Sequence, residues 1–277
     1  MRRALVFVVA AAMFLTAGCS AAKPAAAGTT PAPATTGSTT PSPTGTAPNS
    51  ATTPDQSTPA VNKDNGIIWE QTRIGYPLVS TDPRAKGKKV VALTFDDGPA
   101  SAAQGGATAE ILDILKRENI KATFFVTGYG IKGNTDLLKR EIAEGHTIGT
   151  HTMTHPDLWK IQTKEGIENE MLGVGKIVEQ YTGKPPKFFR PPNGMYRDPH
   201  GYIMEVAKEN NLQVITWTTG ALDWQMRDPQ KITEQVLKTV MPGAIVLMHD
   251  THQWTAEALP GIIQGLRDKG YEFVQLQ

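Results

Sequence analysis

Two aspartates, Asp96 and Asp97, stand side by side directly after an apolar run that is typical of a β-strand. Adjacent carboxylates repel each other, so a purely structural role explains the pair poorly. A divalent cation would remove the repulsion by binding one carboxylate, and the other would stay free to take a proton from water. The pair therefore indicates a metal-assisted hydrolytic site.

Two histidines, His151 and His155, have a spacing that places two imidazoles on one side of a helical turn, as two ligands of one metal ion must be. The pair alone is weak, because histidines at this spacing are more often surface or core residues. No glutamate follows His151, which excludes the metalloprotease motif His-Glu-x-x-His. Two histidines and one carboxylate leave positions open for water and a carbonyl oxygen, the arrangement of a hydrolytic zinc site.

The elements that must position these residues alternate along the chain from Lys89 onward. Apolar stripes at helical period have Thr163 and Asp228 as expected N-caps, with Gly183 and Gly270 beyond expected helix ends. This alternation predicts parallel β/α units, and about seven units favour a closed or nearly closed barrel over an open doubly wound sheet. The expected strands are 90–95, 123–126, 147–148, 188–189, 214–217, 244–248 and 273–276.

Unusual polar residues follow five of these seven apolar runs. Catalytic residues of (β/α) barrels gather at the carboxyl ends of the strands, so we expect the five places to form one site. No Gly-x-Gly-x-x-Gly follows the first strand, and a dinucleotide site therefore has no support. The five places are 96–99, 151–155, 190–194, 223–224 and 249–250.

The residues at these places resemble, in order, the five motifs of the polysaccharide deacetylases, carbohydrate esterase family 4, which share the NodB-homology domain. The resemblance covers about 89–277 and implies a distorted (β/α) barrel that removes N- or O-acetyl groups from sugar polymers with one divalent metal ion. The matching stretches are Thr94-Phe95-Asp96-Asp97-Gly98-Pro99, His151-Thr152-x-x-His155, Arg190-Pro191-Pro192-x-Gly194, Asp223-Trp224 and Leu247-x-His249.

Carried over position by position, the resemblance implies that Asp97, His151 and His155 are the metal ligands. It implies that Asp96 is the general base and that Arg190 orients it. A ligand set of two histidines and one aspartate favours borderline metals over Mg²⁺ or Ca²⁺. We therefore expect Zn²⁺, with Co²⁺, Ni²⁺ or Mn²⁺ as alternatives.

The same resemblance implies that His249 is the general acid, with Asp223 tuning its charge. Trp224 and Leu247 would wall the acetate pocket, and a backbone N–H near Asn193 would help to polarise the acetyl carbonyl. Amide hydrolysis needs an activated water, a stabilised oxyanion and a proton for the leaving amine. The implied residues supply all three.

Two positions depart from the family pattern, and both concern the substrate groove. Asn193 stands where the third motif commonly has an aromatic residue, and Gly220 stands where the fourth motif often has an aspartate. Trp159 and Trp254 lie just after motif residues and are candidates either for stacking on sugar rings or for packing. The remaining histidines match no motif and are interpreted as ordinary residues: His146, His200 and His252.

The N-terminal residues resemble the export signal of a bacterial lipoprotein. Arg2 and Arg3 precede an apolar stretch at 4–15, and small residues lead to Cys19, the one cysteine of the chain. The usual leucine of the lipobox is replaced by Thr16. We expect 1–18 to be a signal peptide, Cys19 to carry acyl chains, 19–66 to be a disordered Ala/Pro/Thr-rich linker, and 67–277 to be the catalytic domain.

Composition restricts the classes of binding partner that this protein can have. A net charge of +1 gives no electrostatic attraction to nucleic acid, and a single cysteine excludes an intrachain disulfide scaffold. No apolar run after residue 20 approaches the roughly 20 residues of a membrane span. We expect an exported monomer that a lipid anchor at Cys19 holds on the outer face of the cell membrane.

Three functions remain open from the sequence. The first is a deacetylase of peptidoglycan amino sugars, which the export signal and the long tether favour. The second is a chitooligosaccharide deacetylase or an acetylxylan esterase. The third is a non-catalytic wall-binding protein, which would require a lost ligand, base or acid; every one of these residues is present.

Overall fold

The computed structural model describes residues 69–70, 79–80, 88–194 and 197–276, all within one compact unit at 56–277. The predicted signal peptide, Cys19 and the predicted linker at 19–66 lie outside the described residues. β1 (Trp69–Glu70) and β2 (Val79–Ser80) form a small antiparallel sheet. No described helix is both long enough and apolar enough to cross a membrane.

The other described strands form one parallel sheet, in the order β7-β6-β5-β4-β3-β9-β8. The central strand β3 pairs with β9 over its length, from Val91 opposite Ala244 to Asp96 opposite His249. Its other edge is shared, because β10 pairs with its first residues and β4 with its last. The strands are β3 (Val90–Asp96), β4 (Thr123–Val126), β5 (Thr147–Thr150), β6 (Phe188–Phe189), β7 (Gln213–Val214), β8 (Thr219–Gly220), β9 (Ala244–His249) and β10 (Glu272–Val274).

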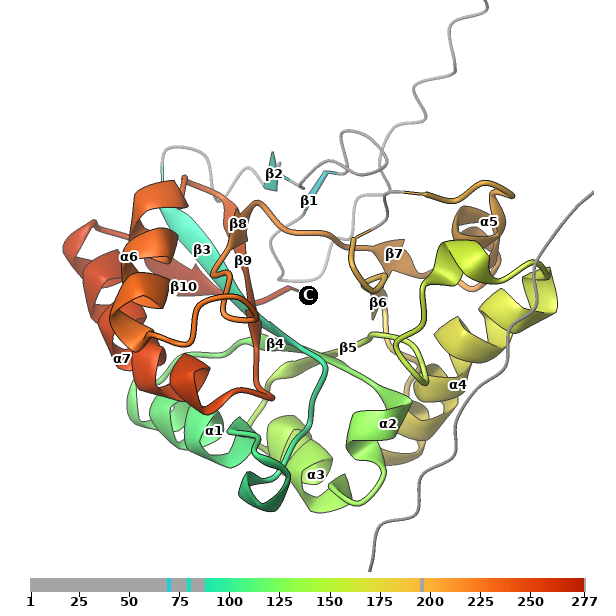
Figure 1. The fold of residues 1–277 in the computed structure, drawn as a ribbon, viewed down its shortest axis with the longest axis horizontal. Helices are drawn as coiled ribbons and strands as arrows, with labels where there is room; N and C mark the ends of the chain where they lie inside the picture. The colour runs from blue at the N-terminus through green and yellow to red at the C-terminus, as the bar shows by residue number, and fades with distance from the viewer. Residues whose placement is uncertain (1–68, 71–78, 81–87, 195–196, 277) are drawn as a thin grey trace, which may run out of the picture. The chain divides into compact units, whose positions relative to one another are not determined.

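The sheet curls on itself with helices on its outer side, which confirms the predicted distorted (β/α) barrel (Figure 1). Its two edge strands, β7 and β8, follow each other in the chain, and no ladder joins them in the described residues. We call the gap between β7 and β8 the seam of the barrel. Residues 215–218 cross it without forming a strand, so the strand predicted over 214–217 is present only at its first residue. The barrel is therefore open along one line.

Two of the helices begin where a side chain satisfies terminal N–H groups, and two end at or just before a glycine, as the sequence predicted. The Thr163 side chain accepts a hydrogen bond from Gly166 N, and Asp228 accepts from two backbone N–H groups with Pro229 in the first turn. Gly183 and Gly270 have positive φ of 68° and 79°, as chain reversals after a helix require. The helices are α1 (Thr108–Arg117), α2 (Gly128–Ile131), α3 (Thr135–Ala143), α4 (Lys164–Thr182), α5 (Tyr202–Glu209), α6 (Pro229–Thr239) and α7 (Gln253–Asp268).

The two faces of β3 show how the fold separates core from site. All seven of its residues are buried, and successive side chains point to opposite faces. Val91, Leu93 and Phe95 pack in the large core with the helices, whereas Ala92 belongs to an apolar cluster with Phe125. The face that carries Ala92 continues as Thr94 and Asp96. It is therefore apolar at its start and polar at its carboxyl end, where the site lies.

Candidate active site

Three candidate metal ligands converge at the carboxyl ends of β3 and β5. Asp97, His151 and His155 each offer a ligand atom, and these atoms lie within 4.8 Å of one another. Asp97 Oδ1 is 3.5 Å from His151 Nε2 and 3.3 Å from His155 Nε2. Residues that are far apart in the sequence thus present two imidazoles and a carboxylate to one point.

The tautomer of His151 is fixed by its neighbours. Its Nδ1 lies 2.6 Å from the carbonyl oxygen of Arg190, which can only accept, so Nδ1 carries the proton. Burial lowers the pKa of His151 to about 3, which keeps the ring neutral. The Nε2 lone pair is therefore available on the side of Asp97, as a metal ligand requires.

The local backbone at the histidine pair differs from the helical turn that the spacing predicted. Residues 151–157 form an irregular loop, with positive φ at Thr152 (73°) and His155 (56°). The Thr152 hydroxyl accepts a hydrogen bond of 3.0 Å from His155 N. The prediction of a helix was wrong, yet this turn brings the two rings together, with centroids 5.0 Å apart.

The donor set fits a divalent metal ion. Asp97 Oδ1 is buried, and no hydrogen-bond donor among the described residues satisfies it. Asp97 itself holds a left-handed backbone conformation with φ of 76°, a strained state that points to a functional demand. An orphaned carboxylate oxygen facing two imidazole nitrogens is accounted for by a cation of the kind that nitrogen and oxygen ligands prefer.

Asp96 faces a different partner, the fully buried Arg190. Arg190 Nη1 donates to Asp96 Oδ1 at 2.6 Å and to the Thr94 hydroxyl at 2.8 Å. Its remaining nitrogens donate to the carbonyl oxygens of Ile215 and Thr216, which lie in the seam of the barrel. Burial raises the pKa of Asp96, and the charge of Arg190 partly opposes the rise. The result is a fixed carboxylate with more basic character than an exposed aspartate.

His249 and Asp223 form a second pair across the pocket. His249 Nδ1 donates to Asp223 Oδ1 at 2.8 Å, and His249 N donates to Asp223 Oδ2 at 2.7 Å. Burial alone would lower the pKa of His249, but the hydrogen bond and charge of Asp223 outweigh it and raise the pKa to about 9. Thr255 and Trp254 donate to the side chain and the backbone carbonyl of Asp223, which fixes its position. His249 therefore carries a proton on both ring nitrogens at neutral pH.

The metal-ligand candidates, Asp96 and His249 line one cavity of about 340 Å³. Most of the site residues expected from the sequence line it, while Arg190 and Asp223 lie buried behind Asp96 and His249. Trp224 is 42% exposed and meets the His249 ring edge-on at 5.5 Å. The expected residues in its wall are Asp96, Asp97, His151, His155, Asn193, Trp224, Leu247 and His249.

One residue that lines the cavity was not identified as a site residue from the sequence. His252 lines the cavity and stacks on Trp254, with ring centroids 4.7 Å apart, although it matches no motif. Asp250, in the expected place 249–250, is buried, accepts from the Thr108 hydroxyl, and lies so close to Gly98 that no Cβ would fit there.

Comparison with known proteins agrees with this geometry. A family model described as polysaccharide deacetylase matches residues 84–215. A peptidoglycan-N-acetylglucosamine deacetylase of Bacillus cereus is 39% identical over 195 residues, which cover 68% of this chain and 69% of the relative. The chain belongs to the polysaccharide deacetylase family.

Further members of the family differ in length and in activity. Peptidoglycan-N-acetylglucosamine deacetylase PgdA of Listeria monocytogenes is 43% identical over 70% of this chain, which spans about two fifths (39%) of that relative. The crystal structure of a Bacillus cereus polysaccharide deacetylase matches with a TM-score of 0.62 and 38% identity, over 69% of this chain and 93% of that chain. A Bacillus anthracis family member described as a pseudoenzyme matches with a TM-score of 0.61 and 31% identity, over 68% and 64%.

Proposed function

We propose that this protein is a metal-dependent hydrolase that removes N-acetyl groups from a cell-wall polysaccharide, with peptidoglycan amino sugars as the substrate. The observation that carries the proposal is one cavity in which a ligand triad meets two differently tuned acid–base pairs. Relatives named peptidoglycan deacetylases support the choice of polymer. Because the family also contains a pseudoenzyme, the preserved residues of this chain matter more than membership.

In the proposed reaction the two pairs divide the proton transfers. Asp96 takes a proton from water, whose oxygen then bonds to the acetyl carbon, and Arg190 holds Asp96 in place through its 2.6 Å hydrogen bond. The carbon–nitrogen bond breaks as His249 gives its proton to the leaving amine. The products are acetate and a free amino sugar. Each proton-transfer group contributes on the order of 10²–10⁴ in rate.

Asp97, His151 and His155 would hold the metal ion, for which we propose Zn²⁺. When bound, the ion would supply Lewis-acid polarisation of the acetyl carbonyl and of water. Asn193, Trp224 and Leu247 line the cavity, where they would surround the acetyl group.

We further propose that the protein acts outside the membrane as a monomer anchored by lipid at Cys19. Support comes from the charged and apolar N-terminus, from the single cysteine after small residues, and from a polymer that lies outside the membrane. With a net charge of +1, no nucleic-acid partner is proposed.

Acetate release tests the proposal. The purified chain, stripped with chelator and reconstituted with Zn²⁺, is assayed on peptidoglycan, chitooligosaccharides and acetylated xylan side by side. We expect release from peptidoglycan that is lost with the metal and restored by Zn²⁺. Release from chitooligosaccharides or acetylated xylan alone would overturn the choice of peptidoglycan as the substrate. No release from any of the three polymers by the zinc-loaded protein would support a non-catalytic wall-binding role.

A further inference from the structure

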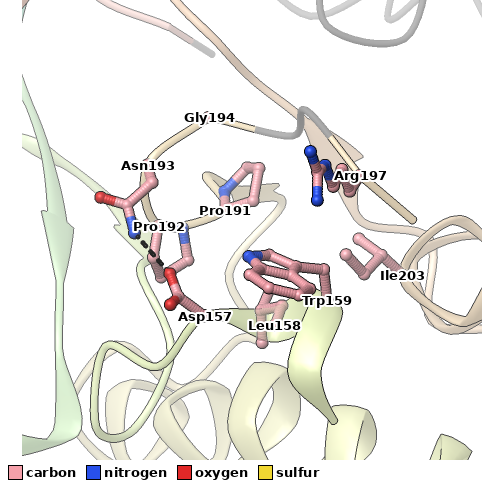
Figure 2. Close-up of a pocket in the computed structure, with 9 residues that line it drawn as sticks. All are labelled: Asp157, Leu158, Trp159, Pro191, Pro192, Asn193, Gly194, Arg197 and Ile203. Atoms are coloured by element: carbon pink, nitrogen blue, oxygen red, sulfur yellow. Dashed lines mark hydrogen bonds between the residues drawn. The ribbon is translucent and has the colours of Figure 1, made fainter. Parts of the chain in front are cut away.

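A second cavity, of about 270 Å³, adjoins the cavity that holds the ligand triad. Figure 2 shows the residues that line this second cavity. Pro191 and Asn193 line both cavities and form the partition between them. The partition is held in place, because Asn193 donates to Asp157 Oδ1 at 3.1 Å. A volume near the lower end of the roughly 300–1,000 Å³ of small-molecule pockets suits one sugar unit rather than an oligosaccharide.

Trp159 forms one wall of this second cavity, as Figure 2 shows. Its side chain is 40% exposed, in a short 3-10 turn (Leu158–Lys160) directly after the histidine loop. Trp159 belongs to none of the apolar clusters of the described residues, so its ring can contact a ligand in this cavity. The apolar C–H face of a pyranose ring is the natural partner of such an indole.

The charges around Trp159 favour an anion. Lys160 Nζ and the Arg197 guanidinium lie 5.1 Å and 5.4 Å from the centroid of the indole. Lys160 is paired at 2.7 Å with Asp157, so these two charges offset each other. Arg197 forms no ion pair with any carboxylate in the described part of the chain. Its planar fork of donors matches a carboxylate.

We propose that this second cavity is a subsite for the sugar unit next to the one that loses its acetyl group, and that the unit carries a carboxylate. Trp159 stacks on the ring and Arg197 binds the carboxylate, while the Asn193 partition separates this unit from the metal ligands. The inference rests on the proposed function and deepens it. The glycan strand of peptidoglycan alternates a neutral amino sugar with one that bears a lactyl group, whose carboxyl is a free carboxylate where no stem peptide is attached, whereas chitin carries no acid.

Two variants and two matched controls test the subsite in the full chain. Arg197→Gln removes the charge, and Trp159→Ala removes the stacking ring. Arg117→Gln, at the exposed end of α1, and Tyr181→Ala, 39% exposed near the end of α4, are the controls. The substrates are glycan strands freed of peptide, the same strands with methyl-esterified carboxylates, intact peptide-bearing strands, and chitopentaose.

We expect Arg197→Gln to raise KM about tenfold on the peptide-free strands, with kcat unchanged, because one charge-assisted hydrogen-bond pair is lost. KM for chitopentaose and for the esterified strands should not change. Trp159→Ala should raise KM on every polymer but leave hydrolysis of 4-nitrophenyl acetate unchanged. A shift with Arg197→Gln on peptide-bearing strands alone would assign the carboxylate to the peptide and overturn the lactyl assignment.

An equal KM for wild type and Arg197→Gln on acidic strands, or an equal rise on acidic and neutral polymers, would overturn the subsite. Binding of a peptide-free disaccharide, followed by tryptophan fluorescence, separates this failure from failure of the proposed function. If the wild type releases no acetate but binds the disaccharide, and Arg197→Gln binds it about tenfold more weakly, the subsite stands while the proposed reaction fails.

Discussion

Asp96 and Asp97 have identical side chains, yet the fold gives them different surroundings. Asp96 is the last residue of β3, and its side chain continues the face that carries Ala92 and Thr94 and meets Arg190. Asp97 leaves the strand with φ of 76°, and its carboxylate turns toward the two histidines. The backbone conformation at one residue therefore separates a paired carboxylate from an orphaned one.

This separation predicts that replacing Asp96 and replacing Asp97 have different effects on metal binding and turnover. Asp97→Ala should lose both bound zinc and turnover, whereas Asp96→Asn should keep zinc and lower kcat by about 10²–10⁴, the contribution of a general base. Zinc content by elemental analysis and acetate release on the same samples check both statements. Equal loss of zinc in both variants would show that Asp96 is a ligand.

The pair formed by His249 and Asp223 predicts the alkaline side of the pH profile. With a pKa of about 9, His249 keeps its proton at neutral pH, and kcat/KM should fall as pH rises through about 9. Asp223→Asn removes the charge that favours the imidazolium, so the pKa of His249 falls and the alkaline limb should move to lower pH by at least about one unit. The acid limb, set by Asp96, should stay in place. An unmoved alkaline limb would assign it to another group.

At the scale of elements, the caps of α4 show how much of the local structure depends on short-range chemistry. The Thr163 hydroxyl takes up one of the free N–H groups at the start of α4, and Gly183 reverses the chain after its end. Between them Ile167, Met171 and Val178 are buried at helical period. These features lie within one segment of sequence, and they were predicted from it.

Thr163→Ala should therefore lower the free energy of unfolding by about 1 kcal/mol, because one backbone N–H loses its partner. In a domain of this size the melting temperature should fall by about 2–4 °C. Thr163→Ser keeps the hydroxyl and should melt close to wild type, and Lys176→Ala, exposed on the same helix, is the control for a loss of surface side chain. A melting temperature unchanged in Thr163→Ala would contradict the capping role.

Sequence analysis assigned two elements wrongly: a loop that a short-range hydrogen bond turns, and a strand that a distant side chain interrupts. The two histidines have helical spacing in the sequence. The segment is an irregular loop instead, because the Thr152 hydroxyl accepts a hydrogen bond from His155 N and both residues have positive φ. The expected strand over 214–217 is interrupted, because Arg190 binds the carbonyls of Ile215 and Thr216. The Arg190 contacts join residues 25 and 26 positions apart in the chain, so the pattern of either segment alone does not indicate them.

At the scale of the whole molecule, the N-terminal residues predict where the protein resides. Cys19→Ala should move the protein from the membrane fraction to the soluble exterior fraction with its catalytic activity retained. Residues 20–60 offer no apolar surface to replace lost acyl chains, and the apolar stretch at 4–15 is shorter than a membrane span. Fractionation followed by N-terminal sequencing checks this. Wild-type protein found free outside the cell, with its N-terminus beyond Cys19, would contradict it.

The central position of β3 dictates when the chain can fold. Its partners β9 and β10 come from the far end of the chain, and the Thr94 hydroxyl binds the carbonyl of Val246 across a separation of 152 residues. Contacts of such long range make folding slow, since a large loop must close before the pairing is gained. A ribosome-bound or half-translocated chain therefore lacks most of the partners of its middle strand. The middle of the sheet is completed only once β9 and β10 have been synthesised and have reached β3.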